Sequence, residues 1–422
     1  MLITFLIIFF VLLIIGAPIW LALGMSGGFF ALYYMGLPIT NVPSHFFNAM
    51  DSFVLMAIPY FLLAGNLMTY MGTARKMLGF INNLLGHLPG GVPAAAVVAA
   101  TIFGALSGSA TATVIAVGSM MIPEMVRLGY SKKNSMGVVA AAGTLGQMIP
   151  PSIFMILYAS IVQLNVSDLF LAGIVPGLVI AGILIITTVF ISLRENKVRK
   201  ERAPFKDIVS SFFEALPALL MLVIVLGGIY SGVFTPTEAA AVSVVYVVIV
   251  SFLFNREEFT KENLLKSLHG TMVTTAVIFI ILGGATLFAT SLTYAQIPQG
   301  ITEFVTSISF PGWAIMILVL LLILVFGMFL DAVPILYITV PILYPVIISL
   351  GYDPIHFGII MVALLMIGQV TPPVGMSLFA ITGYFKENLS VSIRGVIPYL
   401  YALVIATIII VYVPWLSTFL LK

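Results

Sequence analysis

The sequence has no cysteine and very little charge. The absence of cysteine from its 422 residues excludes disulfide bonds and thiolate metal sites. Charged residues make up 8% of the chain, whereas soluble domains carry about 25%. The formal net charge of +2 argues against a nucleic-acid partner. A water-soluble fold is therefore a poor explanation of this composition.

Motifs that carry enzyme chemistry are also scarce. The chain has no GxxxxGK[ST] segment, so it does not itself hydrolyse ATP through a P-loop. Its four histidines, His45, His87, His269 and His356, lie too far apart to suggest a metal site. The segment 24–28 matches GxSxG but lacks the strand–turn–helix context of a hydrolase. We therefore expect no enzymatic activity.

Apolar residues are abundant instead. They form 61% of the chain, and the mean hydropathy is +1.21. Apolar runs long enough to cross about 30 Å of hydrocarbon recur throughout, which predicts an all-α polytopic membrane protein. Residues 1–24 lack a basic start, so we read them as a retained first helix. The predicted full spans are 2–24, 50–72, 136–164, 169–193, 215–232, 237–254, 269–290, 356–382 and 395–420.

Two further apolar stretches, 92–125 and 312–348, each contain a polar break. The breaks are Ser107–Ser109 in the first and Asp331–Pro334 in the second. Each half has about 15 residues, or roughly 22 Å of helix, which is too short to span. We predict two re-entrant helical hairpins whose tips meet inside the membrane. Segments 73–88 and 293–308 are predicted to be helices along the two membrane interfaces.

The chain repeats itself at an offset of 222 residues. Proline, glycine and glutamine positions coincide under this shift, including Gly146-Gln147 with Gly368-Gln369 and Pro150-Pro151 with Pro372-Pro373. The two copies are 1–193 and 215–422, joined by a basic, cytoplasmic linker at 194–214. Lys and Arg flank the first hairpin but are absent from 291–311 and 349–355 around the second. Because cytoplasmic loops are rich in Lys and Arg, the copies are predicted to be inverted.

The doubled Pro-Pro segments and the hairpin tips are the predicted site. Adjacent prolines should unwind a helix and free carbonyl oxygens, which are tolerated in a membrane where they line a cavity. Such oxygens suit Na⁺, although a plain packing kink is the alternative. Asp331 is a lone charge in an apolar run and a candidate to bind Na⁺ or carry a proton. Its alternative role is to cap the following helix.

Four segments in order resemble the large membrane subunit of tripartite ATP-independent periplasmic (TRAP) transporters. They are GALSGSATATVIAVGSMMIPEM, GTLGQMIPPSI, GGIYSGVFTPTEAAAV and IGQVTPPVG. The resemblance implies an elevator-type fold in which a scaffold holds a mobile domain with both hairpins, in the bacterial inner membrane. It also implies Na⁺ coupling, a separate small four-helix membrane subunit and a periplasmic substrate-binding protein.

The same resemblance places the ion sites. They would use Ser107, Ser109, Gly146 and Ser152 in the first repeat, and Gly327, Asp331, Thr371 and Pro372 in the second. We expect Thr111, Gln147, Pro150 and Gln369 to contact the substrate, an organic acid such as sialic acid or a C4-dicarboxylate. The alternatives are an ion-coupled carboxylate carrier that acts alone and, less favoured, an ion channel.

Overall fold

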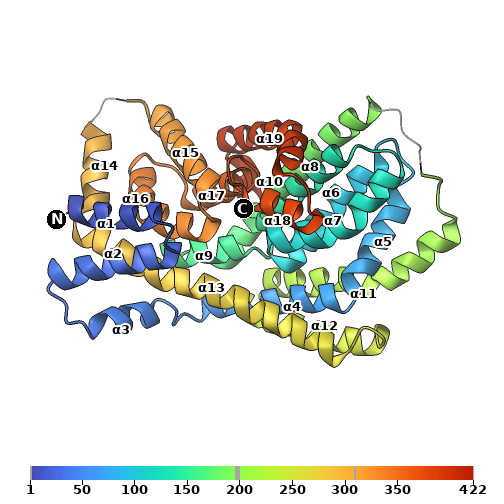
Figure 1. The fold of residues 1–422 in the computed structure, drawn as a ribbon, viewed down its shortest axis with the longest axis horizontal. Helices are drawn as coiled ribbons and strands as arrows, with labels where there is room; N and C mark the ends of the chain where they lie inside the picture. Colours follow the sequence, from blue (N-terminus) through green and yellow to red (C-terminus); the bar gives the residue numbers. More distant parts are fainter. Residues whose placement is uncertain (1, 195–199, 308–309, 422) are drawn as a thin grey trace.

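The computed structural model describes residues 2–194, 200–307 and 310–421, and all regular secondary structure in these ranges is helical (Figure 1). The basic residues Lys197 and Arg199 of the predicted linker lie outside them. The helices of the first part are α1 (Leu2–Ile14), α2 (Ile19–Tyr33), α3 (Asn41–Asn48), η1 (Val54–Met56), α4 (Ala57–Tyr70), α5 (Thr73–Leu85), α6 (Gly91–Ser107), α7 (Ala110–Arg127), α8 (Lys132–Gly143), η2 (Thr144–Gln147), α9 (Ile153–Val162) and α10 (Val166–Leu193). Those of the second part are α11 (Phe205–Tyr230), α12 (Pro236–Phe254), α13 (Lys261–Tyr294), α14 (Ile297–Ser307), α15 (Gly312–Phe329), α16 (Ala332–Ser349), α17 (Pro354–Gly368), α18 (Met376–Phe385), α19 (Leu389–Tyr412), α20 (Trp415–Thr418) and η3 (Phe419–Leu421).

Several helices are long and apolar enough to cross a membrane. Among the described residues there are seven, namely α10, α11, α12, α13, α15, α16 and α19. An eighth is obtained if Val54–Tyr70 and Thr73–Leu85, which meet at a 69° bend, are counted as one broken span. The predicted all-helical architecture is confirmed.

The first predicted span, 2–24, is wrong. Helix α1 ends at Ile14 and α2 begins at Ile19, and the two pack against each other. Gly16 adopts a left-handed backbone conformation with φ of 81°, and Pro18 precedes the new helix. The left-handed Gly16 and the extended Pro18, whose ring also removes an amide hydrogen, together end the first helix and start the second.

Other spans also differ from the sequence-based bounds. Those predicted at 136–164 and 356–382 are interrupted at the proline pairs, as the doubled Pro-Pro motif indicated. Helix α11 begins at Phe205, so 205–214 of the predicted linker is helical. Helix α13 has 34 residues and is about 50 Å long. The predicted span 269–290 was shorter than this helix, because hydropathy marks only the apolar central part of α13.

Both hairpin stretches form two helices joined by a break. The first is α6–α7 and the second is α15–α16. The predicted half-length of about 15 residues is wrong, since α6 has 17 residues and the other three have 18. By length alone, α15 and α16 can each cross a membrane.

Helices α5 and α14 lie at opposite ends of the molecule and run across the direction of α13 (Figure 1). Helix α5 packs on α6 and α11, whereas α14 packs on α13 and α16. The prediction that helices form within 73–88 and 293–308 is confirmed. The predicted start of the second helix, residue 293, is wrong, because α13 extends to Tyr294 and α14 begins at Ile297.

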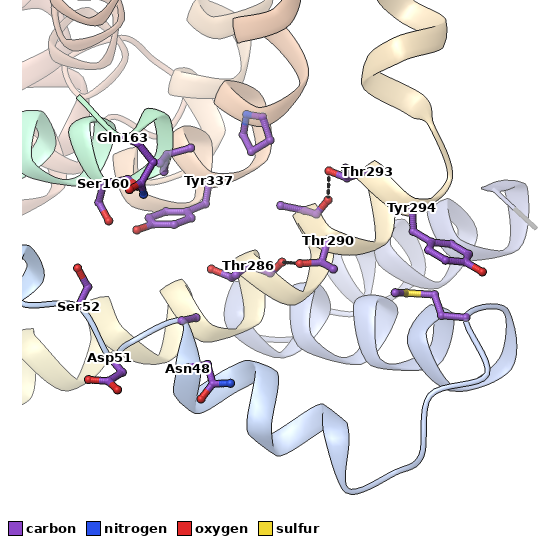
Figure 2. A pocket seen from close by; sticks show the side chains of 15 residues that line it. Asn48, Asp51, Ser52, Ser160, Gln163, Thr286, Thr290, Thr293, Tyr294 and Tyr337 are labelled. Carbon is purple, nitrogen blue, oxygen red and sulfur yellow. Dashed lines mark hydrogen bonds between the residues drawn. The ribbon is translucent and has the colours of Figure 1, made fainter.

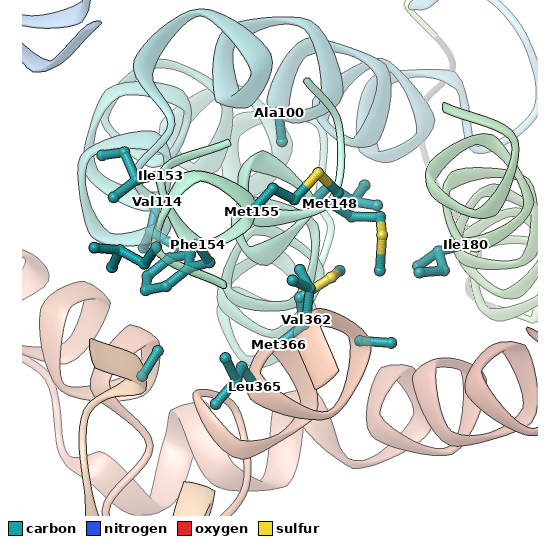
Figure 3. Packing of buried hydrophobic residues seen from close by; sticks show 14 of the residues in the cluster. Ala100, Val114, Met148, Ile153, Phe154, Met155, Ile180, Val362, Leu365 and Met366 are labelled. Atoms are coloured by element: carbon teal, nitrogen blue, oxygen red, sulfur yellow. The ribbon is translucent and has the colours of Figure 1, made fainter. Parts of the chain in front are cut away.

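The core lies around α17, whose residues from His356 to Gly368 are all buried. A helix that is apolar on every side needs neighbours on every side. Met148 and Met155, at the break of the first half and on α9, pack against Val362 and Met366 of α17 (Figure 3). The two interrupted helices are thus held together by the core.

The 222-residue offset recurs in the helix boundaries. Helices α7 and α16 begin at Ala110 and Ala332, and their N-caps are Ser109 and Asp331. The peptide bonds Pro150-Pro151 and Pro372-Pro373 are both cis. The structure therefore places equivalent residues at equivalent points of both halves.

Candidate functional site

A cavity of about 230 Å³ forms where the two hairpin tips approach the two interrupted helices. Five of the predicted site residues line it: Ser109, Thr111, Gln147, Asp331 and Gln369. Residues of both tips therefore line one cavity, and their meeting inside the membrane stays a prediction. We call this cavity the tip cavity.

The first tip is a network of hydroxyl groups. Ser109 caps α7 by accepting a hydrogen bond from the amide of Ala112 at 3.4 Å. Its Oγ lies 3.2 Å from Oγ1 of Thr111, and Oγ of the buried Ser107 lies 3.0 Å from Oγ1 of Thr113. These hydroxyl oxygens keep lone pairs for a cation or for a donor on a ligand.

The second tip places a carboxylate at the equivalent point. Oδ1 of Asp331 accepts a hydrogen bond from the amide of Ala332 at 2.8 Å and so caps α16. The capping role considered from the sequence is therefore confirmed. Among the described residues that line the tip cavity, Asp331 is the only charged one.

The two interrupted helices meet through identical side chains. Nε2 of Gln147 donates to Oε1 of Gln369 at 2.6 Å, and both residues are buried. Oε1 of Gln147 has no hydrogen-bond partner within the described structure, although it is buried beside the cavity. Because an unpaired buried carbonyl costs free energy, this atom is a good acceptor for a bound ion or substrate.

The other predicted site residues lie outside the lining of the tip cavity. They are Ser107, Gly146, Pro150, Ser152, Gly327, Thr371 and Pro372. The hydroxyl of Ser152 donates to the carbonyl of Gln147, and that of Thr371 donates to the carbonyl of Ile367 at 2.6 Å. Both hydroxyl groups therefore stabilise the interrupted helices without lining the cavity.

The predicted glycines allow each tip helix to touch an interrupted helix. A Cβ added to Gly104 of α6 would lie 2.5 Å from Cα of Gly146. In the second half, a Cβ on Gly368 would lie 2.6 Å from Cα of Gly327 on α15. Contacts this short exclude any side chain, so both halves use a glycine pair to hold tip and break together.

Sequence reasoning missed the opposite wall of the site, which α4 and α13 supply. Leu62, Thr274 and Ile278 line the tip cavity. A second cavity of about 250 Å³ continues past the first tip and adds Asn66 and Thr69. Nδ2 of Asn66 donates to Oγ1 of Thr271 at 2.9 Å, joining α4 to α13. The sequence feature that could have indicated this wall was Asn66, a side-chain amide inside an otherwise apolar run.

Residues 6–416 match the family described as "Tripartite ATP-independent periplasmic transporter, DctM component". The chain belongs to this DctM family. The resemblance seen in the four sequence segments is thereby confirmed.

Curated relatives cover nearly the full length of this DctM-family chain. The C4-dicarboxylate TRAP transporter large permease protein DctM of Pseudomonas aeruginosa is 42% identical over 94% of this chain and 92% of its own length. The 2,3-diketo-L-gulonate permease YiaN of Escherichia coli is 34% identical, covering 95% of this chain and 94% of its own length. The sialic acid permease SiaM of Vibrio cholerae is 33% identical, covering 96% and 94%.

Solved structures share the fold at low sequence identity. The YdaH transporter of Alcanivorax borkumensis aligns with a TM-score of 0.63 and 13% identity, over 88% of this chain and 86% of that one. MtrF of Neisseria gonorrhoeae also gives 0.63, with 16% identity over 91% and 85%. The DctM-family chain is therefore a multi-pass membrane protein of a bacterial transporter family. This membership favours transport over the ion channel considered from the sequence.

Proposed function

We propose that this protein is the large membrane subunit of a Na⁺-coupled importer of an organic acid, most favourably a C4-dicarboxylate, in the bacterial inner membrane. Relatives that are 42%, 38% and 36% identical are named C4-dicarboxylate permeases, whereas the sialic acid permease is 33% identical. A small four-helix membrane subunit and a periplasmic substrate-binding protein would complete the tripartite system that the family name describes.

The observation that carries Na⁺ coupling is the charge of the tip cavity. The described residues of its lining supply one carboxylate, several hydroxyl and amide oxygens and no Lys or Arg. An organic anion entering here meets no fixed positive charge, and placing it beside Asp331 without a cation is unfavourable where water is scarce. Cations bound by the tip oxygens would supply the missing charge, so ion and acid would bind together.

We assign the two ion sites to the two tips. The first would use Ser107, Ser109 and the segment from Gly146 to Ser152. The second would use Gly327, Asp331 and the segment Thr371–Pro372. Carbonyl oxygens freed where α8 and α17 end supply ligands in both. Thr111, Gln147, Pro150 and Gln369 would then contact the acid.

The proposed movement is an elevator-type displacement of both tips relative to a scaffold. Lys and Arg surround the base of the first hairpin, whereas 291–311 and 349–355 have none, which supports inverted repeats at 1–193 and 215–422. Helices α5 and α14 connect α4 and α13 of the scaffold to the two hairpins. These connections would let the tips move while α4 and α13 stay in place.

Uptake into proteoliposomes tests the proposal. The complete transporter, with its small subunit and binding protein, should accumulate radiolabelled succinate when Na⁺ is higher outside. Replacing the Na⁺ gradient by K⁺ should abolish accumulation. Sialic acid and isethionate in parallel assays decide the substrate class. Uptake that is equal with Na⁺ and K⁺ would refute Na⁺ coupling, and uptake without the binding protein would favour a carrier that acts alone.

A further inference from the structure

A larger cavity than the two beside the first tip lies away from the tips and has no role in the site described above. Its volume is about 730 Å³, and the end of α13, the segment 48–52, α9 and α16 surround it. Ser52, Ser160 and Tyr337 face one another at one end, and Thr286 and Thr290 of α13 lie beside them (Figure 2). The cavity is polar on several sides, so it is not a gap in apolar packing.

Three threonines make one polar face of α13 here. Thr286, Thr290 and Thr293 follow one another at helical spacing and all line the large cavity. We call them the threonine cluster. The hydroxyls of Thr290 and Thr293 donate to the backbone carbonyls four residues earlier, both at 2.9 Å. Each hydroxyl can rotate to donate to a carboxylate instead, and Tyr337 and Gln163 add further groups that can donate.

One helix connects this cavity with the site. Helix α13 contributes Thr274 to the two cavities beside the first tip, Ile278 to the tip cavity and the threonine cluster to the large cavity. Thr274 and Thr286 are 12 residues apart, or about 18 Å along the helix. Between them lie buried apolar residues, including Ile281, Leu282 and Ala285.

The second hairpin forms the wall between the two regions. Helix α16 contributes Val333 to the tip cavity and Tyr337 to the large cavity, one turn further along. At the other side, the first tip rests against α4, where a Cβ added to Gly65 would lie 2.8 Å from Cα of Ser107. In this arrangement the first tip shares cavities with Asn66 and Thr274, and the second tip shares one with Thr274. Residues 107–111 and 331–333 are not among the described residues that line the large cavity.

We propose that the threonine cluster is a second binding position for the organic acid on the scaffold, which the acid occupies when the tips face the large cavity. The inference rests on the proposed function and adds to it the scaffold residues that the acid contacts in each position of the tips.

In the arrangement described here the acid contacts Asn66 and Thr274. In the other it meets Thr286, Thr290 and Thr293. Residues 276–285 of α13 have no polar side chain, so the acid has two favourable positions on α13. Asp51 is the one charged residue among the described residues that line the large cavity, so an accompanying cation favours binding here as well.

The absence of native cysteine makes a direct test possible. Thr290→Cys would be introduced into the complete transporter in proteoliposomes and labelled with a membrane-impermeant, negatively charged methanethiosulfonate. Succinate with Na⁺, together with the binding protein, should slow labelling at least about threefold. The matched control is Thr306→Cys, on an exposed part of α14, whose labelling should not change. Equal labelling of Thr290→Cys with and without succinate would overturn the proposal.

Transport kinetics provide a second test of this binding position. Thr290→Val keeps the shape of the side chain and removes one hydroxyl, so KM for succinate should rise about 2- to 10-fold, as expected for one lost hydrogen bond. Thr290→Ser should restore most of the affinity. An unchanged KM in Thr290→Val would contradict the proposal even if the wild-type protein shows Na⁺-driven uptake.

Cross-linking separates this inference from the proposed movement. Thr111→Cys paired with Thr274→Cys should cross-link in the resting protein, because both residues line the same two cavities. Thr111→Cys paired with Thr286→Cys should cross-link only during transport. If the second pair links but succinate gives no protection at Thr290→Cys, the movement stands and the threonine cluster is not a binding position. If unmodified protein shows no Na⁺-driven uptake, the proposed function itself fails.

Discussion

Gln147 and Gln369 occupy the same position in the two halves, and Nε2 of Gln147 donates a hydrogen bond to Oε1 of Gln369 at 2.6 Å. An amide has both a donor and an acceptor, so two copies of one residue can bond across a repeat. Two carboxylates or two ammonium groups could not. The pair joins the end of η2 to the end of α17 beside the tip cavity.

Replacing either glutamine by leucine should destabilise the protein by about 1–3 kcal/mol, because the remaining amide is left buried without its partner. The double variant should lose less than the sum of the two single changes, because the shared bond is removed only once. Thermal unfolding of the four proteins in detergent, with succinate uptake in parallel, measures this. Strictly additive losses would show that the two side chains act independently.

Asp331→Asn should abolish Na⁺-driven uptake while the protein still folds and inserts. Asparagine retains a capping oxygen for the amide of Ala332, so α16 should survive. It removes the one charged side chain among the described residues of the tip cavity, and with it most of the attraction for a cation. The measurement is uptake across a range of Na⁺ concentrations, with membrane insertion and Tm as controls. Normal uptake with an unchanged Na⁺ dependence would mean that Asp331 is only a helix cap.

Gly104→Ala should destabilise the protein by about 1–3 kcal/mol or more and reduce transport, because the added methyl would lie 2.5 Å from Cα of Gly146. Gly182→Ala on α10 is the matched control, since nothing lies within 4 Å of its added Cβ. That control should be neutral or slightly stabilising, as alanine favours helix. Thermal stability and uptake of both variants would be compared, and equal behaviour would contradict a role for the glycine pair.

Asn255→Ala should loosen the attachment of α5 to the turn between α12 and α13. Nδ2 of the buried Asn255 donates to Oγ1 of Thr73 at 2.9 Å, and Nζ of Lys76 donates to the carbonyl of Phe254 at 3.1 Å. Loss of the amide should cost about 1–3 kcal/mol and slow uptake more than it weakens succinate binding. Glu262→Gln, at an exposed pair with Lys266, should leave both Tm and uptake unchanged. A similar effect of the two substitutions would argue against this role.

The helix breaks could be predicted from the sequence where polar residues or prolines recur in both halves of the chain. The breaks at Ser107–Ser109, at Asp331 and at both proline pairs were all visible in apolar surroundings. The structure brings residues of both tips and of both interrupted helices to one cavity. The break after Ile14 was missed because Gly16 and Pro18 occur once and have no counterpart that would mark them. The scaffold wall was missed for a different reason. Thr274 and Thr286 look like ordinary polar residues of a span until the fold shows which face of α13 they occupy.

The two tips are equivalent in position but differ in charge, since Ser109 caps one and Asp331 the other. In the proposed cycle the unloaded tips therefore carry one net negative charge as they return from the cytoplasmic to the periplasmic side. A bacterial membrane potential, negative inside, favours that direction by up to about 2.3 kcal/mol per 100 mV for a charge that crosses the whole field. The potential would thus act on the return of the empty carrier. An imposed inside-negative K⁺ diffusion potential should accelerate net uptake more than exchange, because exchange omits the empty return.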